Sequence, residues 1–268
     1  MAGNKMANRF RRQMDLFYAY LAKTAVSQSV ENIHRLRVTI KNIRALLVLM
    51  DKACRGALQK KDHLKVYAAL FRKAGQARDI QVSLGSLKSN RASYLIPYKK
   101  YLRGILKIKL RKLQMESLAI DLKLLDKLSQ ELFKKMEDIH PASLPERTAA
   151  MISHLLNRVK SLSQKPRDLK TLHDIRILLK TVQENLDILI RLKPPDKWMA
   201  VDKKLRPLYE ALGKWHDQAL LIKSLKAFLV KTGPGYAHLE RLVSRLEKDN
   251  HEKENKSYKL LQKLPAGF

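Results

Sequence analysis

Two segments of the chain carry histidine, arginine and lysine at the same helical spacing. The first set lies within residues 29–51 and comprises His34, Arg37, Lys41 and Arg44. The second set comprises His173, Arg176 and Lys180, each at the same constant offset from its counterpart in the first. An arginine guanidinium matches the oxygens of a phosphate with a planar fork of donors, lysine supplies a point charge, and histidine supplies a pH-dependent donor. The repeated spacing therefore predicts a surface that binds anions.

The same segments are patterned as amphipathic helices with matching apolar faces. In the first segment the apolar positions follow helical spacing. Each of them has an apolar counterpart at the equivalent position of the second segment. The face consists of Ile33, Leu36, Ile40, Ile43, Leu47 and Met50, and its counterpart of Leu172, Ile175, Leu179, Val182, Leu186 and Leu189. At about 100° per residue, the basic row lies about 120° round from the apolar face. This position beside the core partly desolvates the charges and strengthens their attraction to an anion, whereas a fully solvated face is the alternative.

Two weaker repeats follow, and the separation between their copies along the chain is one residue shorter than the separation between the two basic rows. Arg103 and Lys107 correspond to Arg241 and Arg245, and both pairs stay basic although the surrounding residues diverge. We expect these side chains to widen the anion-binding surface, while ordinary surface charge is the alternative interpretation.

Glycine and aspartate also recur at this shorter offset, as Gly75 with Asp79 and Gly213 with Asp217. Glycine costs roughly 1 kcal/mol in a helix interior, so its presence suggests a close approach of another element. An aspartate in a basic site most simply orients or neutralises an arginine or lysine. We therefore assign these four residues structural and orienting roles rather than catalytic or metal-binding ones.

The composition indicates a globular protein with a polyanionic partner. The 268 residues include 45% hydrophobic residues and carry a formal net charge of +30. Such an excess of positive charge exceeds what solubility requires and is compensated most naturally by nucleic acid, an acidic membrane surface or an inorganic polyanion. The single cysteine, Cys54, excludes a disulfide framework. Without a signal-peptide pattern or an apolar run of about 20 residues, we expect a cytoplasmic protein that does not contact membranes.

Helical periodicity extends over nearly the whole chain, which predicts an all-α fold. The expected helices span about 5–27, 29–51, 58–88, 91–118, 121–139, 144–164, 168–192, 196–231 and 235–263. Breaks rich in proline and glycine separate several of them, at 141–145, 164–168, 193–196 and 232–236. The repeats predict a tandem duplication of two four-helix bundles within one domain of residues 1–268, with halves at 1–140 and 141–268.

Sequence motifs of common enzymes are missing. The chain has no HExxH, GxxxxGK[ST] or GxGxxG motif and no dense carboxylate cluster, so we expect no enzymatic activity, no cofactor and no metal site. Aromatic residues make up only 6% and form no interleaved stacking platform. A helix-turn-helix or zinc-finger signature is also missing.

The segment IHRLRVTIKNIRALLVLMD, followed by AGQARDIQVSL, resembles the CHAD family, the conserved-histidine α-helical domain. The family hallmark is H-x-x-R-x-x-x-K-x-x-R on one helix and an L-G-x-x-R-D-like element on the next. The first copy matches the helical motif in full, whereas Gln183 replaces the last arginine in the second. In the second element, Ala74 replaces the leucine of the first copy and His216 the arginine of the second. The departure at Gln183 predicts an asymmetric site in which the second copy holds charge less strongly.

The resemblance implies two bundles related by a pseudo-twofold axis, with basic rows that face a central cleft or pore. It also implies binding of inorganic polyphosphate and, in some members, association with polyphosphate granules. We therefore expect a non-enzymatic polyphosphate-binding protein that also accepts other polyanions. The alternatives are a binding module for single-stranded nucleic acid or RNA and, less favoured by the motifs, an enzyme that processes polyphosphate.

Overall fold

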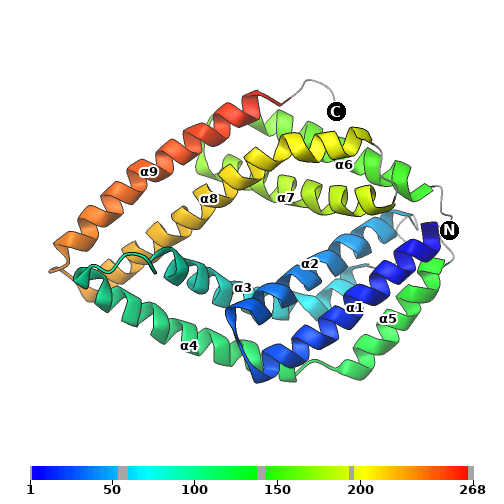
Figure 1. The fold of residues 1–268 in the computed structure, drawn as a ribbon, viewed down its shortest axis with the longest axis horizontal. Coiled ribbons are helices and arrows are strands. Elements are labelled where there is room, and N and C mark those ends of the chain that lie inside the picture. Colours follow the sequence, from blue (N-terminus) through cyan, green and yellow to red (C-terminus); the bar gives the residue numbers. More distant parts are fainter. Residues whose placement is uncertain (1, 54–59, 138–142, 193–195, 265–268) are drawn as a thin grey trace. The chain divides into compact units, whose positions relative to one another are not determined.

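The computed structural model describes residues 2–53, 60–137, 143–192 and 196–264. Within these ranges the regular secondary structure is helical, and no strand is present (Figure 1). The α-helices are α1 (Ala2–Val26), α2 (Val30–Ala53), α3 (Lys60–Ser86), α4 (Ile96–Leu118), α5 (Leu122–Glu137), α6 (Ser143–Ser163), α7 (Leu169–Leu192), α8 (Asp196–Thr232) and α9 (Ala237–Gln262). The predicted all-α fold is confirmed, and the predicted helix ends agree within a few residues. Cys54 and His140 lie outside the described residues.

One predicted helix differs at its start. The sequence predicted a helix over 91–118, but residues Ser93–Leu95 form a short 3₁₀ turn, η1, and α4 begins at Ile96. Pro97 follows directly, and proline is favoured in the first turn of a helix because it has no backbone N–H to satisfy. The proline therefore marks the true beginning of α4.

The predicted apolar faces of α2 and α7 are buried. All twelve positions named above are at most 1% exposed. Burial of these side chains fixes the rotation of each helix about its own axis, and this rotation brings the neighbouring basic residues to the edge of the buried face. Along the described part of the chain, no helix is long and apolar enough to span a bilayer.

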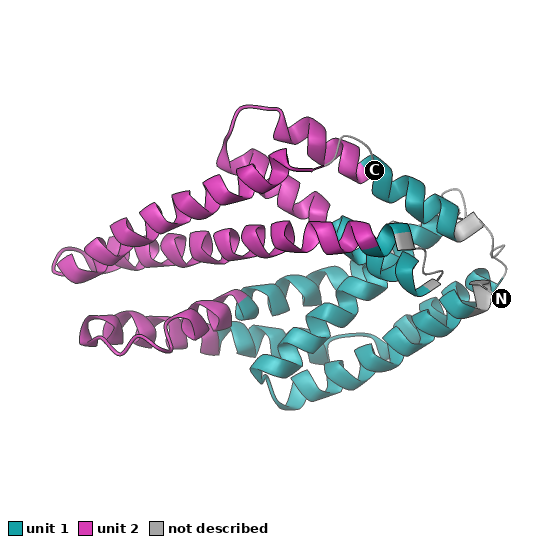
Figure 2. Ribbon diagram, turned by 45° about the horizontal axis from the view of Figure 1, so that its top comes forward, with its two compact units in different colours: residues 1–78, 108–154, 181–199 teal, residues 79–107, 155–180, 200–268 magenta. Residues whose placement is uncertain are grey.

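The chain divides into two compact units, each drawing on both halves of the sequence (Figure 2). Unit 1 comprises residues 1–78, 108–154 and 181–199, and unit 2 comprises residues 79–107, 155–180 and 200–268. The internal duplication into residues 1–140 and 141–268 rests on the sequence repeats alone and stays a prediction. The basic row of α2 belongs to unit 1, whereas His173, Arg176 and Lys180 belong to unit 2.

In unit 1, α1 packs against α2 and α5. Phe10 and Phe17 of α1 are at most 1% exposed, and the Phe17 ring meets Tyr67 of α3 edge to face at 5.3 Å. Arg9 of α1 donates a 2.8 Å hydrogen bond to Asp187 of α7. These contacts hold α2, α3 and the second part of α7 in one packed body.

In unit 2, residues from α4, α8 and α9 form a second core. Tyr98 packs at 5.4 Å from Phe228, and Leu225 and Leu239 of the same cluster are fully buried. The predicted break at 232–236 separates α8 from α9. Gly233 and Gly235 adopt φ values of +74° and +111° there, in a region that side chains disfavour.

Candidate anion-binding site

In unit 1, α2 presents its basic row at the edge of the buried face. Arg37 and Lys41 are partly buried, whereas His34 and Arg44 are exposed. The row therefore combines cations held against the protein with cations that extend into solvent, and the predicted position beside the core is confirmed for this helix.

Arg37 lies against α3 rather than extending freely. Its Nη1 donates a 3.1 Å hydrogen bond to the carbonyl oxygen of Phe71, and its Cζ lies 4.6 Å from the centroid of the Phe71 ring. A Cβ at Gly75 would lie only 2.5 Å from Arg37 Nη1. The close approach predicted at Gly75 is therefore one between a guanidinium and bare helix backbone.

Arg44 approaches the same ring from two helical turns further along α2. Its Cζ lies 5.0 Å from the Phe71 centroid. Both guanidiniums are thus within the distance of about 6 Å at which a cation is attracted to an aromatic face. Phe71 could not be singled out from the sequence, because an aromatic residue one turn before Gly75 becomes a partner of the arginines only when α2 packs beside α3.

Lys41 lies between these arginines in the row and forms an ion pair. Its Nζ lies 3.0 Å from Oε1 of Glu184 on α7, and the two side chains are 35% and 18% exposed. Glu184 was also missed, because the pairing joins residues that are far apart in the sequence. At the offset that relates the two basic rows, Glu184 corresponds to the buried Ala45, so the same position in the first repeat supplies no carboxylate.

The surroundings of His34, at the start of the row, disfavour its protonated form. Burial, and next the positive charge of Arg78 on α3, lower the pKa of His34 below its ordinary value. An anion bound beside His34 and Arg78 would counter the effect of Arg78 and favour protonation.

In unit 2, Arg176 is the most buried cation of the second row. Burial lowers the pKa of Arg176, whereas the negative charges of Asp217 and Asp79 act in the opposite direction. Both aspartates therefore lie close enough to stabilise the positive charge of Arg176, which suits the orienting role predicted for them. The Nε of Arg176 is buried without a hydrogen-bond partner among the described residues.

His173 and His216 form a ring pair beside Arg176. Their centroids lie 5.5 Å apart with an interplanar angle of 34°. Burial and the charges of Arg176, His173 and Lys180 lower the pKa of His216 to about 4. His216 is therefore neutral at pH 7 and contributes a hydrogen-bonding group, not a charge, where the first repeat has Arg78.

The remaining positions of the second repeat differ from the first. Lys180 and Gln183 are exposed on α7. A Cβ at Gly213 would meet no atom within 4 Å. The close approach that the sequence suggested at Gly213 is therefore not found, and the two recurring glycines are not structurally equivalent.

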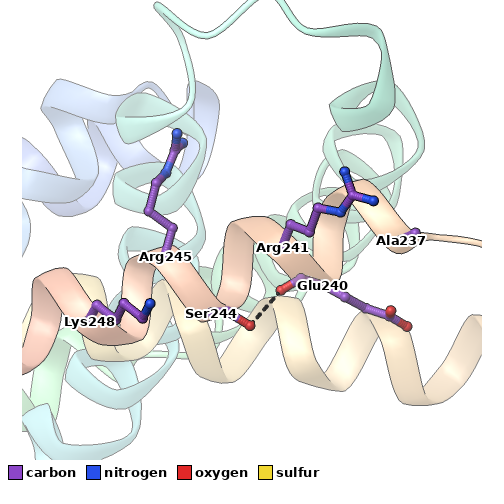
Figure 3. Close-up of a pocket in the computed structure, with 6 residues that line it drawn as sticks. All are labelled: Ala237, Glu240, Arg241, Ser244, Arg245 and Lys248. Atoms are coloured by element: carbon purple, nitrogen blue, oxygen red, sulfur yellow. Dashed lines mark hydrogen bonds between the residues drawn. The ribbon is translucent and has the colours of Figure 1, made fainter.

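A pocket of about 410 Å³ follows one side of α9 in unit 2 (Figure 3). It is lined by Ala237, Glu240, Arg241, Ser244, Arg245 and Lys248. Arg241 and Arg245 extend to the same side of the helix, and the Glu240 carboxylate points in a different direction from these two side chains. Lys248 was missed, although its spacing of seven and three residues from the two arginines places it on the same face.

The other predicted pair, Arg103 and Lys107, is exposed on α4. The residues that line the pocket all come from α9, so this pair is not part of it. In the ranges that the structure describes, no group of three or more histidine, cysteine, aspartate or glutamate residues is arranged to hold a metal ion. The groups that the structure brings together are mainly cations and hydrogen-bond donors, which suit phosphate oxygens.

Comparisons with known proteins agree with the fold. The family model described as CHAD domain matches residues 8–226. The crystal structure of the CHAD domain from the plant Ricinus communis is similar, with 19% sequence identity and a TM-score of 0.75. The match covers 100% of this chain and 94% of the plant chain. No curated protein matches.

Proposed function

The chain belongs to the CHAD domain family, and on that premise we propose that it binds inorganic polyphosphate without chemically converting it. The phosphates contact the basic residues of α2 in unit 1 and of α7 in unit 2, and the pocket on α9 supplies further contacts. The family is one associated with polyphosphate binding. In this proposal the protein collects at polyphosphate granules.

The observation that carries this proposal is the partial burial of basic side chains next to other cations. Arg37 is partly buried and shares the Phe71 ring with Arg44, and the charges of the partly buried Arg176 and of Lys180 both act on His216. Cations held together out of water repel one another unless an anion lies between them. A ligand with charge along its whole length relieves this repulsion at several side chains at once.

The favoured ligand is a slender phosphate chain because the described site supplies donors and cations with few stacking surfaces. Polyphosphate has no bases to recognise, whereas proteins that bind single-stranded nucleic acid usually stack successive bases on aromatic side chains. Phe71 contacts Arg37 and Arg44 and so is already occupied. Single-stranded nucleic acid remains the alternative ligand of the same basic surfaces.

A competition titration at physiological salt tests the choice of ligand. Labelled long-chain polyphosphate is displaced from the full chain by unlabelled polyphosphate or by single-stranded DNA of equal total charge. We expect polyphosphate to compete at least about tenfold better, a difference of about 1.4 kcal/mol. Equal competition would reduce the function to general polyanion binding.

The same samples test the enzymatic alternative. Polyphosphate is incubated with the protein and Mg²⁺ or Mn²⁺, and chain length and released orthophosphate are measured. We expect the chain length to stay unchanged. Protein-dependent shortening that scales with protein concentration would replace the binding function with a catalytic one.

A further inference from the structure

We propose that Phe71 is a positioning residue that holds Arg37 and Arg44 together as one anion-binding unit. The inference rests on the proposed function and adds a residue that has no charge and no place in the repeated basic spacing. Its evidence lies entirely within unit 1, which contains α2 and the part of α3 that carries Phe71.

The geometry sets two like charges beside one ring. Arg37 and Arg44 are seven residues apart on α2, which is a rise of roughly 10.5 Å along the helix. Their Cζ atoms nevertheless lie 4.6 and 5.0 Å from the same Phe71 centroid. The electron-rich face of the ring attracts both guanidiniums and so offsets part of their mutual repulsion.

The backbone next to Phe71 completes the arrangement for Arg37. Nη1 of Arg37 donates to the carbonyl oxygen of Phe71, and Gly75, one turn further along α3, leaves room for the guanidinium. A guanidinium has five N–H donors. This bond and the contact with the Phe71 ring hold the side chain in one orientation. Arg44 contacts the ring and is otherwise exposed.

Preorganisation is the physical consequence of this arrangement. Arginine side chains lose considerable rotamer freedom when they bind a ligand, and fixing them beforehand reduces that loss. A ring that holds two arginines therefore raises the affinity for a phosphate chain without touching the phosphates. Leucine at position 71 fills similar space and removes the aromatic face.

The test compares Phe71→Leu and Phe71→Tyr with the wild-type chain in polyphosphate titrations over a series of salt concentrations. We expect Phe71→Leu to weaken binding by about threefold to tenfold, which corresponds to two modest cation–π contacts. Phe71→Tyr keeps the aromatic face and should retain wild-type affinity. The slope of log affinity against log salt should stay close to the wild-type value in Phe71→Leu, because both arginines are still present to neutralise phosphates and only their ordering costs more.

A matched control exists in the same unit. Arg11 of α1 lies over the ring of Phe133 on α5 at 4.1 Å, and neither residue belongs to the basic row. Phe133→Leu makes the same chemical change there and should leave polyphosphate affinity and its salt slope unchanged. Thermal melting of each variant separates loss of folding from loss of binding.

A double-mutant cycle with Arg44→Ala distinguishes positioning from general packing. If Phe71 acts through the arginines, Phe71→Leu should have a clearly smaller effect in the Arg44→Ala background. Independent effects in the cycle, or unchanged affinity in a folded Phe71→Leu variant, would overturn the inference while wild-type binding still supports the proposed function. A wild-type chain that fails to bind polyphosphate would instead overturn the proposed function.

In that case the ring contact is tested without any ligand. The ¹⁵N-detected Nε–Hε signals of Arg37 and Arg44 should move when Phe71 is replaced by leucine, because the ring current is lost. Signals that stay in place would show that the two arginines are not held by the ring.

Discussion

Lys41 and Arg44 lie one turn apart on α2 but have different neighbours. Lys41 has a carboxylate partner, Glu184, at 3.0 Å, whereas Arg44 lies over an aromatic ring. A bound phosphate must compete with Glu184 for Lys41, whereas no carboxylate of the described residues forms an ion pair with Arg44. Glu184 therefore lowers the affinity of this part of the row for any anion and keeps Lys41 oriented while the site is empty.

Replacement of Glu184 by glutamine should strengthen polyphosphate binding. The change removes the competing charge and leaves a side chain of similar size, so Lys41 can turn to a phosphate. Partly exposed ion pairs contribute up to about 1 kcal/mol, which predicts about twofold to fivefold tighter binding in a titration. Glu131→Gln on α5, which is exposed, makes the same change in net charge and should have little effect. Equal gains in both variants would show that only total charge matters.

At the level of helices, the sequence was sufficient to predict the elements and the position of the basic row of α2 beside the core. Apolar spacing defined α2 and α7, and their buried faces fixed where His34, Arg37 and Arg176 lie. Contacts between helices were not predictable in this way. The pairing of Lys41 with Glu184 and the stacking of Arg37 on Phe71 depend on which helices become neighbours, which periodicity along one helix does not encode.

Gly75 and Gly213 illustrate the same distinction. They recur at the same offset, and helix propensity gives both the same cost. Only Gly75 has a side chain, Arg37, pressed against it. The recurrence alone therefore predicted equal roles that the packing does not support.

Alanine at the two glycines should accordingly have different effects on stability and on binding. Gly213→Ala should raise the free energy of unfolding by about 0.5–1 kcal/mol, because alanine favours the helix and meets no clash. Gly75→Ala should gain less stability and weaken polyphosphate binding, because its Cβ displaces the Arg37 guanidinium. Denaturant unfolding and the polyphosphate titration measure the two effects. Weakened binding in Gly213→Ala, or unchanged binding in Gly75→Ala, would contradict this assignment.

For the whole molecule, a formal net charge of +30 attracts any polyanion. General attraction is screened by salt and depends little on which cations are present, whereas a shaped site depends on particular ones. The two contributions can be separated only by variants that remove the same charge from different places. Arg37 is a poor choice for this purpose because its hydrogen bond to Phe71 also supports the packing of α2 on α3.

Lys41→Ala with Arg44→Ala, compared with Lys123→Ala with Lys127→Ala, provides such a matched pair. Each double variant removes two charges from unit 1, and Lys123 and Lys127 are exposed on α5, which carries none of the basic row. We expect the α2 variant to lose about tenfold or more in polyphosphate affinity at physiological salt, and the α5 variant to lose less than about twofold. At low salt the difference should narrow, because unscreened net charge then dominates. Equal losses at physiological salt would mean that binding reflects net charge alone, and the repeated histidine, arginine and lysine spacing would need a different explanation.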